Sequence, residues 1–143
     1  MTELKLCLNA LLRRTRYPIE IIVVDNGSKD PNMLTYLAGI AGFNKISVVY
    51  NRSNLWVLGL NPALKRFLNY DDSFFVVTDS DIIVPLVNKN RCWLERLLLE
   101  LEKNVTIGKL GLSLDLSFIA KAPEFSQTFR RELNYLQNQK IGS

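Results

Sequence analysis

The sequence contains no histidine. Without histidine, the chain cannot supply the base of a Ser–His or Cys–His nucleophilic mechanism, and it cannot build a histidine-rich zinc site. Any catalysis must therefore use carboxylates, a metal ion, or Lys, Tyr, Ser or Cys side chains.

Cysteines and long apolar runs are also scarce. Cys7 and Cys92 are the two cysteines, and their spacing does not match a metal site, so they are expected to be free thiols in a reducing compartment. No apolar run reaches the ~18 residues that span a bilayer, and residues 1–5 lack the features of a signal peptide. We therefore predict a cytoplasmic protein, and leave open a place at the inner face of the membrane.

The charge imbalance is small, with a formal net charge of +4. It mildly favours anionic partners such as nucleotide phosphates or acidic lipid. No stripe of basic and aromatic residues is visible, so we do not expect nucleic-acid binding. The length of 143 residues predicts a single domain over residues 1–143.

Predicted strands alternate with predicted helices along the first half of the chain. The β-branched and aromatic runs predict strands at 19–24, 46–50 and 74–78, and apolar periodicity predicts helices at 4–12, 32–41 and 60–68. This alternation indicates an α/β fold with a Rossmann-like, mostly parallel sheet flanked by helices. Further along, we expect a helix at 93–102, a strand at 109–116 and a helix at 124–139.

Polar residues follow two of these predicted strands. Asp25-Asn26-Gly27-Ser28 follows the first, and Asp79-Ser80-Asp81 follows the run 74–78. Two carboxylates one residue apart repel each other near a core, and a divalent cation such as Mg²⁺ or Mn²⁺ would relieve that cost. Because ligands of open α/β sheets bind at the carboxyl ends of the strands, Asp25 and Asp79 are expected to lie near each other.

Three stretches carry a resemblance to a known family: "EIIVVDNGSKD", "VVYNRSNLWVLGLNPAL" and "FFVVTDSDIIVP". Over residues 4–115, the chain resembles the nucleotide-binding half of GT-A glycosyltransferases. The closest pattern is that of their large inverting family, family 2, which includes many bacterial polysaccharide enzymes. The resemblance implies a nucleotide-diphosphate sugar as donor, a UDP-sugar first among these, and Mn²⁺ or Mg²⁺ as cofactor.

The resemblance also implies roles for particular residues. Asp25 would lie against the base of the donor, in a pocket that Asn26, Gly27 and Ser28 shape. Asp79 and Asp81 would face the diphosphate and its metal, with Asp81 the more direct ligand. The implied nucleotide-sugar-binding set is Asp25, Asn26, Gly27, Ser28, Asn54, Asn61, Asp79 and Ser80, and the implied metal ligands are Asp79 and Asp81.

The chain departs from the family pattern in three places. Trp56 stands where a small residue is usual, which puts the roles of Asn54 and Asn61 in doubt. The first, central strand of the family pattern is missing, so we expect the strands at 19–24 and 74–78 to flank a gap or to pair anew. The family's catalytic Asp or Glu belongs to an acceptor-binding half, which we expect this chain to lack. Glu124 and Glu132 are the acidic residues there, and neither is assigned as the base.

Three functions stay open at this point. The first is a glycosyltransferase-like domain that binds a donor and a metal for transfer to an unidentified acceptor hydroxyl. The second is a non-catalytic interaction module, or oligomer, that pairs through an open sheet edge. The third is a phosphatase of the haloacid dehalogenase type, since a strand ending in Asp79-Ser80-Asp81 also fits that motif.

Overall fold

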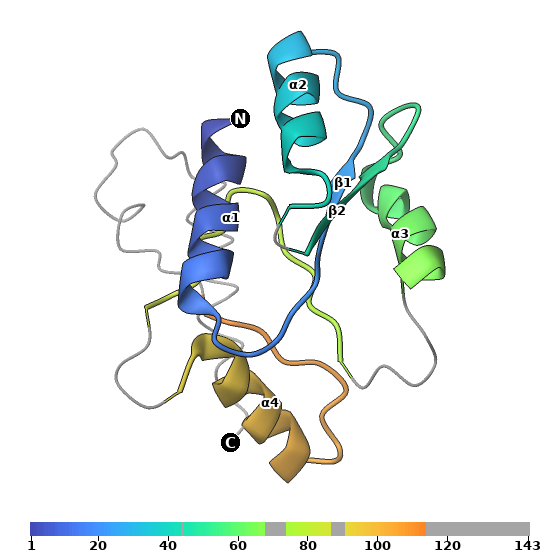
Figure 1. Cartoon of the computed structure of the whole chain (residues 1–143). Coiled ribbons are helices and arrows are strands. Elements are labelled where there is room, and N and C mark those ends of the chain that lie inside the picture. Colours follow the sequence, from blue (N-terminus) through green and yellow to red (C-terminus); the bar gives the residue numbers. More distant parts are fainter. Residues whose placement is uncertain (44, 68–73, 87–90, 114–143) are drawn as a thin grey trace, which may run out of the picture. The chain divides into compact units, whose positions relative to one another are not determined.

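The computed structural model describes residues 1–43, 45–67, 74–86 and 91–113 of the chain (Figure 1). The chain divides into two compact units, Met1–Thr106 and Ile107–Ser143, and the described helices and strands all lie in the first. In chain order they are α1 (Thr2–Arg14), β1 (Ile21–Asp25), α2 (Pro31–Ile40), β2 (Ile46–Tyr50), the 3-10 helix η1 (Trp56–Leu60), α3 (Asn61–Phe67) and α4 (Trp93–Lys103). The α/β class is confirmed, whereas one glycosyltransferase-like domain over residues 1–143 stays a prediction.

The sheet of the first unit is a parallel pair, β1 and β2. Ile21 lies opposite Ile46, and Asp25 lies opposite Tyr50. Helix α2 connects the two strands and contacts β2, as a βαβ unit requires. Its N-cap is Asp30, whose side chain accepts a hydrogen bond from the N–H of Asn32 at 2.9 Å. The predicted parallel arrangement of these two strands is therefore confirmed.

Helix α1 contributes one wall of the main core. The apolar cluster consists of Cys7, Ala10, Leu11, Val84, Cys92, Trp93, Leu94 and Leu98, and Ile19, Ile21 and Leu97 pack against it. Two long-range hydrogen bonds join its parts. Arg14 Nη1 donates to the carbonyl of Val84 at 2.7 Å, and Trp93 Nε1 donates to Thr15 Oγ1 at 2.9 Å. The core therefore joins α1, α4, the start of β1 and the segment around Val84.

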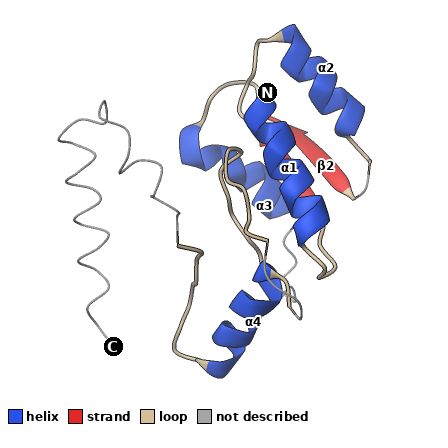
Figure 2. Ribbon diagram, turned by 90° about the vertical axis from the view of Figure 1, so that its left-hand side faces the viewer, coloured by secondary structure: helices blue, strands red, loops and turns tan. Residues whose placement is uncertain are grey.

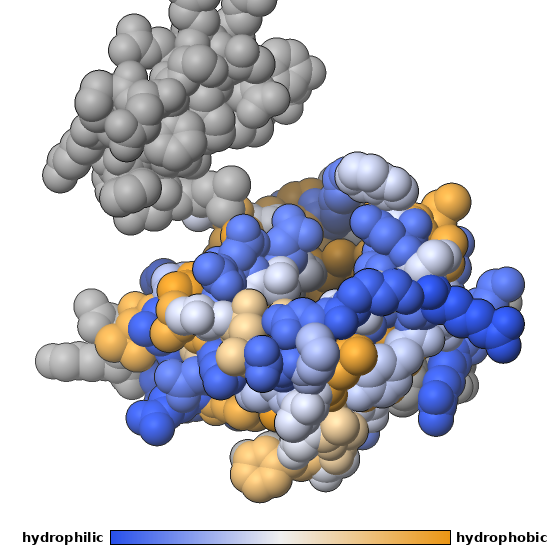
Figure 3. Space-filling model, turned by 90° about the horizontal axis from the view of Figure 1, so that it is seen from above, coloured by the Kyte–Doolittle hydropathy of each residue, from blue (hydrophilic) through white to orange (hydrophobic). Residues whose placement is uncertain are grey.

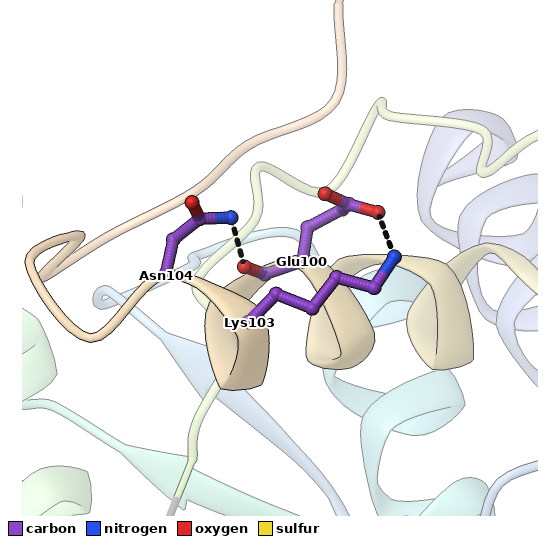
Figure 4. Close-up of polar contacts among 3 residues, drawn as sticks. All are labelled: Glu100, Lys103 and Asn104. Carbon is purple, nitrogen blue, oxygen red and sulfur yellow. Dashed lines mark hydrogen bonds and ion pairs between the residues drawn. The ribbon is translucent and has the colours of Figure 1, made fainter.

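Helix α4 has defined interactions at both ends. At its start, the N–H of Cys92 donates to the carboxylate of Glu95, completing a capping box. At its end, Lys103 Nζ lies 3.1 Å from Glu100 Oε1, and Asn104 Nδ2 donates to the carbonyl of Glu100 at 2.9 Å (Figure 4). The helix predicted at 93–102 is confirmed.

The strand predicted at 74–78 is wrong. These residues form no strand, and the described chain between α3 and α4 is loop (Figure 2). Four consecutive apolar side chains there are exposed: Phe74 by 49%, Phe75 by 61%, Val76 by 52% and Val77 by 58%. A strand needs a partner strand for its backbone, and none of the described residues supplies one here.

Two further predictions concern the C-terminal part of the chain. Residues 109–113 form no strand, so that part of the strand predicted at 109–116 is wrong. Residues 114–116 and the helix predicted at 124–139, with Glu124 and Glu132, lie outside the described residues.

The surface of the described chain mixes polar and apolar side chains. On the face shown in Figure 3, apolar atoms lie between polar ones. No helix in the described ranges is both long and apolar enough to cross a membrane.

Candidate functional site

The turn after β1 is built around Asp25. This last residue of the strand is only 7% exposed. Its carboxylate oxygens accept from the N–H of Ser28 at 3.3 and 3.2 Å, and its carbonyl accepts from the N–H of Asn51 at 2.8 Å. The helix cap that follows is Asp30, so Asp25 is not the N-cap of α2. Asp25 is therefore a buried carboxylate at the carboxyl end of a parallel strand, where ligands of such sheets bind.

The next residue, Asn26, joins this turn to the segment after β2. Asn26 Oδ1 accepts from Asn51 Nδ2 at 3.0 Å and from the N–H of Leu55 at 3.3 Å, and Asn26 Nδ2 donates to the carbonyl of Trp56 at 2.9 Å. Asn51 Nδ2 also donates to the carbonyl of Gly59 at 2.9 Å. We call Asn26, Asn51, Leu55, Trp56 and Gly59 the Asn26 cluster. The side chain of Asn26 makes three of the hydrogen bonds in this cluster. These bonds hold the turn after β1 against the segment after β2.

Glycine is required at two positions beside this cluster. Gly27 has a φ of 86°, and a Cβ there would lie 2.9 Å from the backbone of Ser53. A Cβ on Gly59 would lie 2.2 Å from Asn26 Oδ1, far inside van der Waals contact. The turn after β1 therefore approaches Ser53 more closely than a side chain at position 27 would allow, and Gly59 approaches the Asn26 side chain in the same way.

The segment from Leu55 to Leu58 presents apolar side chains to solvent. Trp56 is 81% exposed, Val57 74% and Leu58 64%. Trp56 also has a positive φ of 52°, a conformation that costs a non-glycine residue on the order of 1–2 kcal/mol. Asn54 Oδ1 accepts from the N–H of Trp56 at 2.9 Å, while Asn26 holds its carbonyl. Hydrogen bonds on both sides thus hold the residue in this conformation.

The Asp79-Ser80-Asp81 triplet lies in an exposed turn. The carbonyl of Asp79 accepts from the N–H of Ile82 at 3.4 Å and from Cys7 Sγ of α1 at 3.8 Å. Burial raises the pKa of the Cys7 thiol, and the negative charge of Asp81 raises that pKa further. The hydrogen bond from Cys7 Sγ places the carbonyl of Asp79 beside the N-terminal half of α1.

The donor chemistry of this triplet suits a hard divalent cation. Asp79 and Asp81 supply carboxylate oxygens, which Mg²⁺ and Mn²⁺ prefer. Within the described ranges, no group of three or more acidic or sulfur side chains could hold a metal alone. Mg²⁺ commonly binds one or two carboxylates and takes its other ligands from water and substrate phosphates. The residues therefore fit a metal that binds together with a phosphate-bearing substrate.

The predicted site residues fall into two groups. Asp25, Asn26, Gly27, Ser28 and Asn54 belong to the turns around the Asn26 cluster, and Asn61, the exposed first residue of α3, follows η1 directly. The triplet forms the second group. No hydrogen bond or ion pair joins the two groups among the residues that the structure describes, so the proximity of Asp25 and Asp79 stays a prediction.

Sequence reasoning missed three residues. Asn51 and Gly59 complete the Asn26 cluster, and Cys7 contacts the triplet from a helix far away in sequence. The position of Asn51 gave a usable signal, because it directly follows β2 at the same sheet edge as Asp25. The contact of Cys7 had no local signal.

Comparison with known proteins gives one match. The family model described as "Glycosyl transferase family 2" matches residues 2–139. No curated protein and no solved structure matches the chain.

Proposed function

Because the chain belongs to glycosyl transferase family 2, we propose that it binds a nucleotide-diphosphate sugar, a UDP-sugar first among these, for transfer of the glycosyl group to an acceptor hydroxyl. The observation that carries the proposal is the buried Asp25 carboxylate, held beside the Asn26 cluster at the carboxyl end of β1. A carboxylate there can accept a hydrogen bond from a ring N–H of the base or from a ribose hydroxyl. The match to the family favours this reading over a phosphatase of the haloacid dehalogenase type.

In this proposal, the turn after β1 recognises the nucleoside. Asp25 accepts from the base, while Asn26, Gly27 and Ser28 shape the pocket wall. The side chains of Asn54 and Asn61 border the same pocket. Both amide atoms of Asn26 are hydrogen-bonded to the segment after β2. We therefore assign Asn26 to shaping the pocket and not to contacting the ligand.

The triplet would hold the diphosphate end of the donor. Asp81, with Asp79 beside it, would bind Mn²⁺ or Mg²⁺, and Ser80 would border the phosphates. When bound, the metal neutralises the charge that develops on the departing nucleoside diphosphate. The acceptor and the catalytic base are not assigned, and donor binding is therefore the step we propose for the described residues.

The free thiols of both cysteines support the proposal of a cytoplasmic location. Cys7 and Cys92 are both free and buried, which is typical of proteins in a reducing compartment. Nucleotide-sugar binding at this location needs no disulfide.

Isothermal titration calorimetry with UDP and Mn²⁺ tests the proposal. We expect the wild-type chain to bind UDP more tightly with Mn²⁺ than without it, and Asp81→Ala to lose this metal dependence. Glu102→Ala is the matched control, because it removes an exposed carboxylate from α4. Metal-independent binding by the wild type, or equal binding by wild type and Asp81→Ala, would contradict the proposal.

One observation favours a second role, that of an interaction module. Residues 74–77 expose four consecutive apolar side chains and form no strand. An apolar, strand-forming segment without a partner can pair with another chain. An oligomer formed this way would appear in light scattering as a mass above that of the 143-residue monomer.

A further inference from the structure

The segment 55–58 presents four consecutive apolar side chains to solvent. Leu55 is 44% exposed, Trp56 81%, Val57 74% and Leu58 64%. The backbone of the same segment is bound on its inner side, because the N–H of Leu55 and the carbonyl of Trp56 both bond the Asn26 side chain. These two polar backbone groups are therefore satisfied within the protein, while the apolar side chains remain largely in water.

The indole of Trp56 is held outward in a fixed backbone conformation. Its φ of 52° is unfavourable for a residue with a side chain. Asn54 Oδ1 accepts from its N–H and Asn26 Nδ2 donates to its carbonyl, so bonds on both sides keep it there. Backbone strain that neighbouring groups maintain is typical of functional positions. The exposed indole is thus a contact surface that the described chain builds and does not itself cover.

The charges near this segment have one sign. Residues 51–67 carry three basic side chains, Arg52, Lys65 and Arg66, and no acidic one. All three basic residues are exposed. Lys65 and Arg66 belong to α3, which follows η1 directly and contacts it. An exposed apolar segment with basic residues on both sides of it in sequence is suited to an anionic, partly apolar partner.

The other exposed apolar run, residues 74–77, differs in the charges beside it. Asp79 and Asp81 follow that run, and both are exposed. A surface of anionic lipid would attract the cations near segment 55–58 and repel these two carboxylates. Charge therefore selects segment 55–58, and not residues 74–77, for contact with such a surface.

We propose that segment 55–58 is a membrane-contacting loop, which inserts Trp56, Val57 and Leu58 into the interface of a bilayer that contains anionic lipid. Tryptophan favours this interface because its ring is apolar and its N–H is polar. Arg52 and Lys65 lie at the level of the lipid headgroups in this arrangement. Burial of apolar surface and attraction to anionic lipid then add to each other. The proposal does not rest on donor binding.

Sedimentation with vesicles gives the first test. The full chain is mixed with vesicles of pure phosphatidylcholine, or of equal parts phosphatidylcholine and phosphatidylglycerol, without nucleotide or metal. We expect binding to the mixed vesicles, binding weaker by about tenfold or more to pure phosphatidylcholine, and weakening of the former in high salt. Absence of binding to the mixed vesicles, or equal binding to both kinds, would overturn the proposal.

Tryptophan fluorescence locates the contact. Trp56 and Trp93 are the two tryptophans, and Trp93 is only 4% exposed, with its Nε1 bonded to Thr15. A change in emission on adding vesicles therefore reports on Trp56, and we expect a blue shift and quenching by brominated lipid.

The same signal tests whether the segment is free before lipid is added. Acrylamide should quench Trp56 strongly in the vesicle-free protein. Protection from acrylamide would overturn the proposal, because another part of this chain or a second copy would then cover the segment. Mixed vesicles that bind the protein without quenching by brominated lipid would overturn it as well.

Trp56→Gly removes the inserted side chain. Glycine adopts a positive φ without strain, so the variant keeps the fold. We expect it to bind the mixed vesicles about tenfold more weakly or worse, and the remaining emission of Trp93 not to respond to them. Val105→Ser is the matched control, because it removes an apolar side chain that is 93% exposed and lies outside residues 51–67. Equal binding by Trp56→Gly and Val105→Ser would contradict the proposed insertion.

A charge reversal tests the headgroup contact. Arg52→Glu combined with Lys65→Glu changes two exposed residues that form no ion pair within the described part of the chain. Arg16→Glu combined with Lys109→Glu makes the same change in net charge at exposed residues elsewhere. We expect the first pair of substitutions to weaken binding to the mixed vesicles by about tenfold or more than the second. Equal weakening by both pairs would show that net charge alone is responsible and would overturn the proposal.

Discussion

Asn26 Nδ2 donates a hydrogen bond to the carbonyl of Trp56 at 2.9 Å and thereby ties the turn after β1 to a tryptophan that is 81% exposed. The same side chain accepts from Asn51 and from Leu55. The hydrogen bonds of Asn26 help to hold Trp56 at its positive φ. Strained, well-anchored residues of this kind gather at functional sites, which agrees with the hydrogen bond that joins Trp56 to Asn26 in the turn after β1.

Removing the hydrogen bonds of the Asn26 side chain should destabilise the protein. Asn26→Ala loses three hydrogen bonds, each with a net contribution of about 1 kcal/mol, so we expect the free energy of unfolding in urea to fall by about 1–3 kcal/mol. Asn32→Ala is the control, because this exposed asparagine lies in the first turn of α2, where its backbone N–H makes the capping bond. Equal unfolding curves for the two variants would contradict the role of Asn26.

Two glycines allow a matched comparison. Gly59→Ala places a Cβ 2.2 Å from Asn26 Oδ1, so the Asn26 cluster must shift and we expect a loss of stability of about 1–3 kcal/mol. Gly39→Ala, inside α2 with open space around it, should stabilise the domain by about 0.5–1 kcal/mol. Thermal unfolding followed by circular dichroism distinguishes the two, and a higher midpoint for Gly59→Ala than for Gly39→Ala would be the opposite of the expected order.

Helices α1 to α4 and strands β1 and β2 were predictable because their signals are local, whereas the 3-10 helix η1 was not predicted. Pro31 and the capping residue Asp30 define the start of α2, and β-branched residues define β1 and β2. The run from Phe74 to Thr78 has an equally strong local pattern and still forms no strand. Strand formation depends on a neighbouring backbone, which a local pattern does not contain.

The candidate site was predictable to a similar extent. Asp25 and Ser28 lie in one turn, as their spacing suggested, and they bond each other. The bonds from Asn26 to Asn51 and Trp56 depend on how two loops meet in space. Likewise, Cys7 and Asp79 are 72 positions apart in the chain, and only the folded α1 brings them together.

The pKa of the Cys7 thiol depends on the charge of Asp81 in the triplet. Burial and the charge of Asp81 raise its pKa. Because a nearby negative charge disfavours the thiolate, Asp81→Asn should lower the pKa of Cys7, while burial keeps it above that of an ordinary cysteine. The measurement is a pH titration of thiolate absorbance in a Cys92→Ser background, whose serine can still cap α4. An unchanged pKa would show that Asp81 and Cys7 do not interact.

The cap of α2 should contribute measurable stability. Asp30→Ala removes the acceptor for the N–H of Asn32, and we expect unfolding to become easier by about 1 kcal/mol. Asp30→Asn keeps a capping oxygen and should recover most of that loss. A urea titration of both variants decides the matter, and an Asp30→Asn variant no more stable than Asp30→Ala would argue against the cap.

In the proposed function, one nucleotide-diphosphate sugar spans the Asp25 turn and the Asp79-Ser80-Asp81 triplet. Calorimetry with uridine and with UDP, each with and without Mn²⁺, tests it most directly. We predict that Asp25→Asn weakens binding of both ligands, whereas Asp81→Asn weakens that of UDP in the presence of Mn²⁺ and leaves uridine binding unchanged. If Asp25→Asn binds uridine as well as the wild type does, or if Asp81→Asn keeps the full effect of Mn²⁺ on UDP, the account is contradicted.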